Sequence, residues 1–199
     1  MRTFQEALKN RRTCYNISDK SPVTDGQIKE ILSFALLHVP SAFNSQSTRL
    51  VLLLGAQHKK LWEITLNILK KITPPAAFAK TEQKINGSFS CGYGTVLFFE
   101  DTAVIKGLQD KFQTYKDNFP VWSEHTNAMH QLAVWTMLED AGLGASLQHY
   151  NPLIDEEVKK TWNIDPNWKL RAEMPFGVKT AEPDPKDFGP LEPRLKIFK

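Results

Sequence analysis

Residues 92–101 read Gly-Tyr-Gly-Thr-Val-Leu-Phe-Phe-Glu-Asp, the most strand-like segment of the chain. Glycines punctuate its start, and β-branched and aromatic residues dominate from Thr95 to Phe99. Such residues are enriched in strands because their side chains pack well on a pleated surface. We therefore expect Gly92–Glu100 to be a central strand of a β-sheet.

Four other segments have strand character. Leu50–Leu54 is a short apolar run that precedes the central strand, whereas Ala145–Gln148 and Lys169–Gly177 follow it. At the carboxyl end, Leu195–Phe198 alternates apolar and basic residues, a pattern that suits an edge strand.

Two capping boxes mark the starts of helices. In Thr3-Phe4-Gln5-Glu6 the Thr hydroxyl can accept from the Glu6 amide while the carboxylate reaches back, which predicts a short helix to about Arg11. Thr24-Asp25-Gly26-Gln27 is the second box, and the apolar positions after it recur at helical period until Pro40.

Helical spacing recurs in the rest of the chain. The longest such segment, Pro120–Gly142, is predicted to be the core helix, with Gly142 in the left-handed conformation that ends it. Three other helices are expected, at Ala56–Ile72, Ala76–Asn86 and Ile154–Trp162.

The order of these elements favours an α+β fold. Two helices separate the two best strands, which argues against a doubly wound sheet. No repeat or linker divides the chain, so residues 1–199 are expected to form one domain. Residues 181–199 are expected to form an extended arm because four prolines interrupt them: Pro183, Pro185, Pro190 and Pro193.

Composition excludes several classes of protein. The chain has 199 residues and 25 Lys and Arg against 22 Asp and Glu, too balanced for the basic stripe of a nucleic-acid binder. Its apolar runs fall short of the roughly 20 residues that span a bilayer. The stretch 1–12 lacks the apolar region of a signal peptide, so we expect no membrane contact and a cytoplasmic location.

Common catalytic and metal motifs are absent from the sequence. There is no Gly-x-Gly-x-x-Gly, Walker loop, His-Glu-x-x-His or Gly-x-Ser-x-Gly. No two of the five histidines are three or four residues apart, so no metal site is expected. Cys14 and Cys91 are too few for a disulfide framework or a zinc site.

Three polar segments are candidates for ligand binding, each with a plainer alternative. Arg11-Arg12-Thr13 ends the first helix, where it either complements the helix dipole or clamps an anion. Asn44 and Gln46 lie in the loop before Leu50–Leu54, where they either stabilise a turn or form hydrogen bonds to the edge of a heteroaromatic ring. Residues 142–150 either stop the core helix or let backbone approach a flat ligand.

A fourth candidate lies in the arm. Arg194 and Lys196 are two residues apart, so in an extended segment both cations share one face while Leu195 and Ile197 pack inward. They either address a phosphate or protect an exposed edge strand.

Together these segments resemble the nitroreductase family of FMN flavoproteins, most closely its short branch of bacterial and fungal proteins linked to stress response. The resemblance runs from Phe4 to the carboxyl end, although the Trp that family members commonly carry after the loop glutamine is replaced by Ser47-Thr48. Its most specific stretches are Arg11–Tyr15, Pro40–Leu54, Gly92–Asp101 and Gly142–Tyr150.

The resemblance implies a central antiparallel sheet flanked by helices, in an intertwined homodimer whose carboxyl arm embraces the partner. It also implies one FMN per subunit at the interface, with residues from both chains. The implied contacts are Arg11, Arg12, Thr13 and Tyr15 with Arg194 and Lys196 around phosphate and ribityl, Asn44 and Gln46 against the flavin, and Ser146, Leu147 and Gln148 near its N5.

The implied activity is NAD(P)H-dependent reduction of nitroaromatics or quinones, with NADH or NADPH and the acceptor occupying the same site in turn. FMN carries the chemistry, so no protein side chain is expected to be a catalytic acid or base. Two alternatives remain: a flavin-binding regulatory or stress-response dimer with incidental turnover, and a structural dimer without cofactor. Five aromatics either line the acceptor pocket or pack in the core: Phe43, Tyr93, Phe112, Tyr115 and Trp122.

Overall fold

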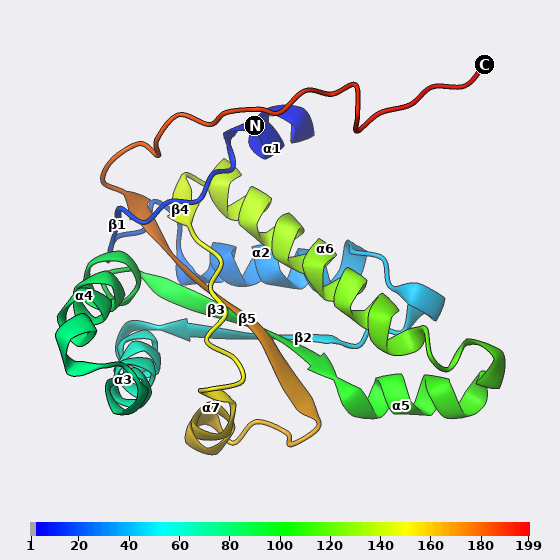
Figure 1. The fold of residues 1–199 in the computed structure, drawn as a ribbon, viewed down its shortest axis with the longest axis horizontal. Helices are drawn as coiled ribbons and strands as arrows, with labels where there is room; N and C mark the ends of the chain where they lie inside the picture. The colour runs from blue at the N-terminus through cyan, green and yellow to red at the C-terminus, as the bar shows by residue number, and fades with distance from the viewer. Residues whose placement is uncertain (1–2) are drawn as a thin grey trace.

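A computed structural model describes residues 3–199, so Met1 and Arg2, which begin the stretch considered for a leader, lie outside it. The described chain contains one antiparallel sheet in the order β1-β5-β3-β2, with β4 also paired to β5 (Figure 1). The strands are β1 (Ile17–Ser18), β2 (Thr48–Leu54), β3 (Gly94–Asp101), β4 (Leu143–Ala145) and β5 (Trp168–Lys179).

Seven α-helices of the described chain surround this sheet. They are α1 (Phe4–Asn10), α2 (Asp25–His38), α3 (Gly55–Ile72), α4 (Pro75–Ile85), α5 (Thr102–Lys111), α6 (Phe119–Asp140) and α7 (Asp155–Trp162). Figure 1 shows α2 and α6 on one face and α3, α4 and α7 on the other. The architecture is therefore α+β, as predicted.

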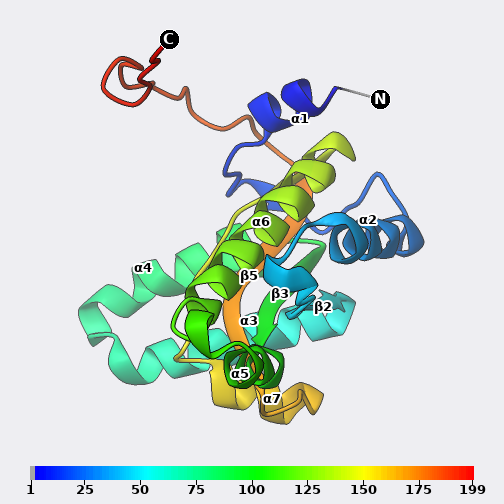
Figure 2. The same cartoon turned by 90° about the vertical axis from the view of Figure 1, so that its right-hand side faces the viewer.

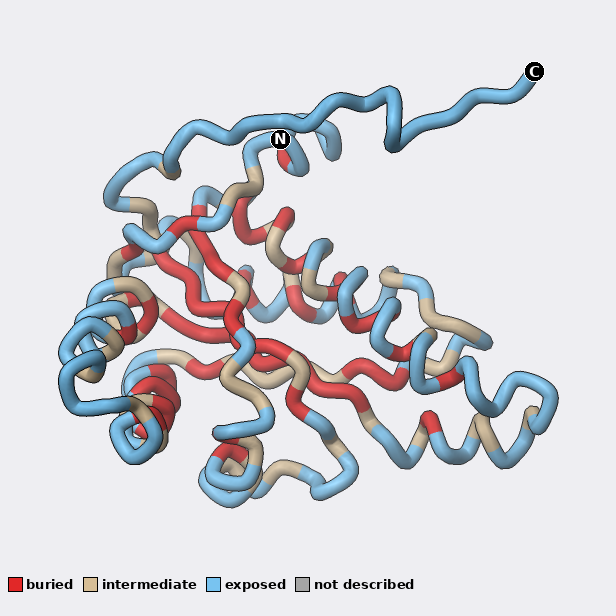
Figure 3. Tube along the Cα trace, viewed as in Figure 1, coloured by how far each residue is buried: buried red, intermediate tan, exposed pale blue. Residues whose placement is uncertain are grey.

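The predicted central strand is confirmed, because β3 lies between β2 and β5. Its alternate side chains enter two separate cores. Val96 and Phe98 pack with α2 and α6, and Leu97 and Phe99 pack with α3 and α7; all four are fully buried (Figure 3). Burial on both faces explains why this strand carries apolar residues at consecutive positions rather than alternate ones.

Both predicted capping boxes form. Glu6 N–H donates to Thr3 Oγ1 at 3.3 Å and Thr3 N–H donates to Glu6 Oε2 at 2.8 Å. Thr24 and Gln27 make the same pair of bonds at the start of α2. The predicted helix end is also confirmed, since Gly142 has a φ of 84°.

Two strand predictions need correction. β4 ends at Ala145, earlier than predicted, and beyond it Gln148 makes only an isolated bridge to Glu173. Leu195–Phe198 forms no strand, because its backbone meets no partner strand within residues 3–199. One helix, α5, is not predicted from the sequence; Asp101 caps it by accepting the backbone N–H of Ala103 at 3.0 Å.

The arm leaves the sheet after β5, passes α1 and extends away from the rest of the chain (Figures 1 and 2). It is exposed along its length, including large apolar side chains that no element of the described chain covers: Phe188, Leu191, Leu195, Ile197 and Phe198. None of the helices in residues 3–199 is long and apolar enough to cross a membrane.

Candidate functional site

The first and third candidate segments, Arg11–Thr13 and residues 142–150, meet at the carboxyl end of α6. Thr13 forms a parallel bridge with Ala145, and Cys14 N–H donates to the Ala145 carbonyl at 2.9 Å. The chain from Arg11 to Thr13 therefore runs beside the segment that continues into Ser146. The structure thus brings together residues more than 130 positions apart in the sequence.

Two arginines at this junction have no acidic partner. The Arg11 guanidinium lies 4.3 Å from the centroid of the Trp135 ring, and its buried Nε has no hydrogen-bond partner. Burial, assisted by the charge of Arg12, lowers the Arg11 pKa. Arg12 donates to the carbonyl of Asp184 at 2.6 Å. Because no carboxylate within residues 3–199 neutralises either side chain, the pair suits an anionic ligand.

A cavity of about 660 Å³ opens at these arginines, between α1 and the arm. Four of its lining residues are cationic and none is acidic; the set is Gln5, Leu8, Lys9, Arg11, Arg12, Lys186 and Phe188. Sequence reasoning missed Lys9 and Lys186, because no local pattern connects α1 to a position in the arm. A cleft lined by one sign of charge concentrates ligands of the opposite sign.

The segment after β4 is held by β5. Ser146 N–H donates to the Pro175 carbonyl at 3.2 Å, and Gln148 Nε2 donates to Ser146 Oγ at 3.0 Å. Ser146 is fully buried, whereas Leu147 is half-buried. This backbone is fixed, and it begins one residue after Ala145, which pairs with Thr13 beside the two arginines.

Glu173 supports the same segment from β5. Its Oε2 accepts the Tyr150 N–H at 2.8 Å, while its buried Oε1 has no hydrogen-bond partner. Burial raises the pKa of Glu173 to about 8, and the charge of Asp155 acts in the same direction. The carboxyl group is thus poised to retain a proton near neutral pH.

Asn44 and Gln46 lie in a strained loop. Phe43, Asn44 and Gln46 have φ values of 56°, 50° and 47°, in the left-handed region that residues other than glycine rarely adopt. Ser41 Oγ accepts the Gln46 N–H at 3.0 Å. Neither side-chain amide of Asn44 and Gln46 has a hydrogen-bond partner within residues 3–199, so both are available to a ligand.

Four of the five candidate aromatics gather at the amino end of α6. The Phe43 ring lies 4.9 Å from Phe112 and stacks on Trp122 at 6.1 Å with 19° between the planes; Tyr115 is 5.8 Å away. Two of the four, Phe43 and Trp122, line a cavity of about 410 Å³ together with Ala42, His125, Thr126 and Met129. Tyr93 lies elsewhere, where its hydroxyl donates to Asp25 at 2.5 Å.

The two halves of the candidate site lie at different places along α6. Phe43 packs on Trp122, whereas Arg11 packs on Trp135. At a rise of 1.5 Å per residue, these tryptophans are about 20 Å apart along the helix axis. Within one chain, Asn44 and Gln46 therefore do not meet Arg11 and Ser146.

Three further predicted site residues, Arg194, Lys196 and Tyr15, also lie away from the junction. Arg194 donates to carbonyls of its own arm, from Nε to Pro190 at 2.9 Å, and Lys196 lies beyond it on the exposed arm. The expectation that Leu195 and Ile197 pack inward is wrong for this chain, because both are exposed. Tyr15 packs against Phe89, with 6.2 Å between the ring centroids, and Lys84 of α4 lies over its ring.

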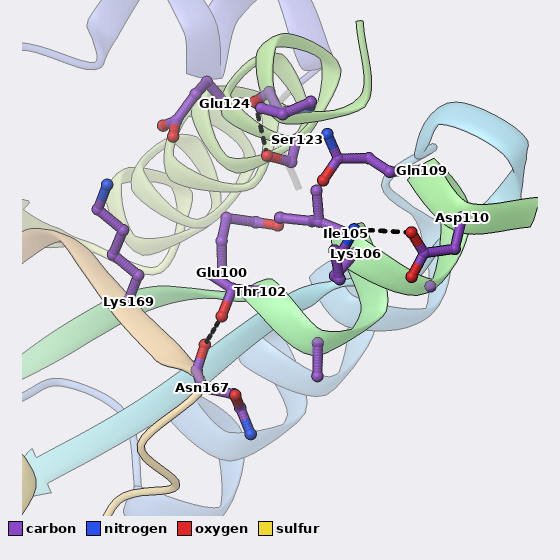
Figure 4. Close-up of a pocket in the computed structure, with 13 residues that line it drawn as sticks. Glu100, Thr102, Ile105, Lys106, Gln109, Asp110, Ser123, Glu124, Asn167 and Lys169 are labelled. Atoms are coloured by element: carbon purple, nitrogen blue, oxygen red, sulfur yellow. Dashed lines mark hydrogen bonds and ion pairs between the residues drawn. The ribbon is translucent and has the colours of Figure 1, made fainter. Parts of the chain in front are cut away.

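A larger cavity, of about 740 Å³, lies between α5, α6 and the start of β5 (Figure 4). Its charged lining is largely paired: Lys106 with Asp110 at 2.7 Å, and Glu124 with Arg171. In the described chain, none of the buried side-chain atoms that lack a partner belongs to this lining. The cavity therefore offers less to a ligand than the cationic cleft does.

Comparison with known proteins gives a consistent family. The nitroreductase family profile matches residues 8–178. The nitroreductase FRM2 of Saccharomyces cerevisiae is 34% identical over 190 residues, which are 93% of this chain and 92% of that protein.

Solved structures agree. The nitroreductase CinD from Lactococcus lactis in complex with chloramphenicol is 43% identical, with a TM-score of 0.90 over 99% of this chain and 100% of that chain. Its complex with 4-nitrophenol has a TM-score of 0.89 with the same identity and coverage. A Desulfovibrio desulfuricans chain assigned to the nitroreductases and solved with FMN shares the fold at 16% identity, with a TM-score of 0.70 over 100% of this chain and 99% of that chain.

The family profile spans most of the chain, and relatives at 34% and 43% identity cover nearly all of it. This protein therefore belongs to the nitroreductase family of oxidoreductases.

Proposed function

We propose that the protein is an FMN-dependent NAD(P)H oxidoreductase that reduces nitroaromatics or quinones in alternating turnover. The observation that carries this proposal is the pair of unneutralised arginines, Arg11 and Arg12, beside the fixed backbone of Ser146–Gln148. The arginines can neutralise and hydrogen-bond a phosphate, and the fixed backbone can border a flat ring. The FMN-bound relative of the same fold supports the choice of ligand.

This chain's residues would divide the binding between them. Arg11 and Arg12 would neutralise the phosphate, with Thr13 as a neutral contact, and the orphaned Nε of Arg11 offers a buried donor. Ser146, Leu147 and Gln148 would border the ring. FMN, when bound, supplies hydride acceptance and donation at N5, while the protein orients the reactants and excludes water.

The aromatic cavity at the amino end of α6 suits the acceptor. Phe43 and Trp122 present ring faces, and Met129 adds a polarisable wall. Such a surface favours flat, electron-poor rings. CinD has been solved with two nitroaromatic compounds, chloramphenicol and 4-nitrophenol, which supports the same acceptor class here.

We propose further that the site is completed in a homodimer. Asn44 and Gln46 have unpartnered amides but lie about 20 Å along α6 from the arginines, so a second chain would supply them. The arm has exposed apolar side chains and packs on no core element, as expected of a segment that embraces a partner. In the dimer, Arg194 and Lys196 would be free to reach the partner's phosphate site.

Visible absorbance of the purified protein, followed by anaerobic titration with NADH and NADPH, tests the proposal. We expect a two-band flavin spectrum that bleaches with reduced nicotinamide and recovers when a nitroaromatic or quinone is added. A protein that binds FMN tightly but turns over no acceptor would instead be a flavin-binding regulator. A colourless protein that FMN cannot reconstitute would refute both.

A matched pair of variants tests which residues bind the phosphate. Arg11→Ala and Arg12→Ala should each weaken FMN binding by at least about tenfold, since a charge-assisted hydrogen bond contributes about 1.5–3 kcal/mol. Lys106→Ala, whose charge lies in the cavity of Figure 4, should leave binding unchanged. Equal effects of all three substitutions would contradict the assignment.

A further inference from the structure

We propose that Glu100 is a positioning residue that locks the loop of residues 41–47 in its ligand-ready conformation. This inference rests on the proposed function, because it assigns Asn44 and Gln46 to the flavin. Glu100 lies near the end of β3 and has 1% of its surface exposed.

The carboxylate of Glu100 accepts hydrogen bonds from the last residue of the loop, the first residue of β2 and a residue of α6. Ser47 Oγ donates to Oε2 at 2.6 Å, and Thr48 Oγ1 donates to Oε1 at 2.5 Å. Asn127 of α6 donates to Oε1 at 2.9 Å, and its own Oδ1 accepts from Gln131 at 2.7 Å. One buried carboxylate thus connects the loop, the central strand and the core helix.

The backbone around this carboxylate adds further restraints. Asp101 N–H donates to the Ser47 carbonyl at 2.9 Å, and Arg49 Nη1 donates to the Gln46 carbonyl at 2.6 Å. Arg49 is itself fixed by an ion pair with Asp101 at 3.0 Å. The end of β3 therefore holds both the side chains and the backbone of the loop.

The loop needs such restraint because its own conformation is unfavourable. Three of the four residues 43–46 are non-glycine residues at positive φ, and such conformations persist only where the surroundings over-determine them. At its start the loop is held by Phe43 in the aromatic cluster. At its end it is held by Glu100. The amides of Asn44 and Gln46, between these two anchors, keep their orientation without a hydrogen bond of their own.

Orientation, more than stability, is the contribution expected of Glu100. A buried carboxylate loses its hydration, and its hydrogen bonds roughly compensate for that loss. An apolar residue would fill the same volume, but it would not fix the directions of Ser47 and Thr48. We therefore expect loss of the network to release the loop before it unfolds the chain.

Two variants perturb the network. Ser47→Ala removes the hydrogen bond from Ser47 Oγ to Glu100. Glu100→Gln keeps the size of the side chain, but its amide group would donate to Ser47 instead of accepting from it. The matched control is Thr95→Val, on the same strand and equally buried, where the hydroxyl bonds His58 and Trp62 far from the loop. Three quantities are measured for each protein: the melting temperature, the amide hydrogen exchange of residues 41–47, and the FMN affinity by fluorescence quenching.

All three variants should melt at a lower temperature than the wild type. Only Ser47→Ala and Glu100→Gln should accelerate exchange at Gln46 and weaken FMN binding, by about tenfold or more, and their bound flavin should lose part of its visible circular dichroism. If Thr95→Val weakens FMN binding equally at equal loss of stability, or if exchange at the loop is unchanged in Ser47→Ala, the positioning role is wrong.

Failure of the inference and failure of the proposed function can be told apart. Hydrogen exchange of the apoprotein reports on the loop without any flavin. A wild-type protein that cannot bind FMN would refute the proposed function, and with it the role of the loop in orienting the flavin. If the wild type binds FMN and both network variants, Ser47→Ala and Glu100→Gln, bind it with the same affinity, only the positioning role of Glu100 is refuted.

Discussion

Glu173 and Gln148 face each other across an isolated antiparallel bridge, in which Gln148 N–H donates to the Glu173 carbonyl at 2.8 Å and Glu173 N–H donates back at 3.0 Å. The Glu173 carboxylate then reaches two residues further and accepts the Tyr150 N–H. A single residue of β5 therefore fixes the backbone that follows Ser146. This arrangement makes the ionisation state of Glu173 important to the proposed flavin wall.

Stability should fall as the pH rises from about 5 to about 8. The pKa of Glu173 is ordinarily 4.5 and rises to about 8 in the folded chain. Between these two pH values the unfolded chain has lost the proton while the folded chain still holds it, so each rise in pH favours the unfolded chain. Asp155, whose pKa is also raised by burial, adds to the effect. The cost should reach a few kcal/mol above about pH 8.

Urea unfolding at several pH values, for wild type and Glu173→Gln, tests this expectation. Gln cannot ionise and resembles the protonated carboxyl group, so the variant should show a flatter decline and should exceed the wild type at alkaline pH. Parallel curves for the two proteins would show that Glu173 does not control the decline.

On the acidic side, His58 should reduce stability. Its Nδ1 lies 2.8 Å from Thr95 Oγ1 in a buried site, and burial lowers its pKa from 6.5 to about 4. The unfolded chain therefore takes up the proton first, and stability is lost as the pH falls from about 6.5 to about 4. His58→Gln should remove this slope in the same unfolding series, and a slope that persists would assign it to other groups.

Two glycines should respond in opposite directions to alanine. A Cβ at Gly177 would overlap the carbonyl oxygen of Ser18, so Gly177→Ala should break the pairing of β1 with β5 and cost more than about 2 kcal/mol. A Cβ at Gly107 meets nothing within 4 Å, so Gly107→Ala in α5 should stabilise by about 0.5–1 kcal/mol. Thermal unfolding measures both, and a neutral Gly177→Ala would mean that β1 can shift.

Removal of residues 188–199 should convert the proposed dimer to monomer. The deleted segment has five large apolar side chains exposed to solvent, which a partner would cover. Light scattering coupled to size exclusion measures the mass, and flavin content is expected to fall with it. The charge-only variant Lys196→Ala is the control and should retain the dimer mass. An unchanged mass for the truncated chain would refute the embracing role of the arm.

Local patterns were sufficient for most of the fold. Capping boxes located α1 and α2, and the apolar run of residues 95–99 located β3. α5 was missed because its amino cap, Asp101, is also the last residue of the central strand, so no turn signal separates the two elements. β1 has only two residues and is defined by its partner, which sequence periodicity cannot reveal.

The candidate site was less accessible to sequence reasoning. Arg11–Thr13 and Ser146–Gln148 stood out as polar or glycine-bordered segments, and the bridge between Thr13 and Ala145 places them side by side. In the sequence, Glu100 is only the last residue of a predicted apolar strand. Its role depends on Ser47 and Asn127, which are 53 and 27 residues away and which no local pattern connects to it. Arg194 and Lys196 have the spacing of a strand, but within residues 3–199 the arm meets no partner strand.

The 22-residue helix α6 acts as a rigid spacer between the two half-sites of each chain. If every complete site draws one half from each subunit, two defective proteins can repair each other. A chain damaged at Arg11 and a chain damaged at Asn44 would each be inactive alone. Their mixed dimer would contain one doubly damaged site and one intact site. Two harmful alleles expressed in the same cell would then be less damaging than either allele alone, a genetic consequence of the length of one helix.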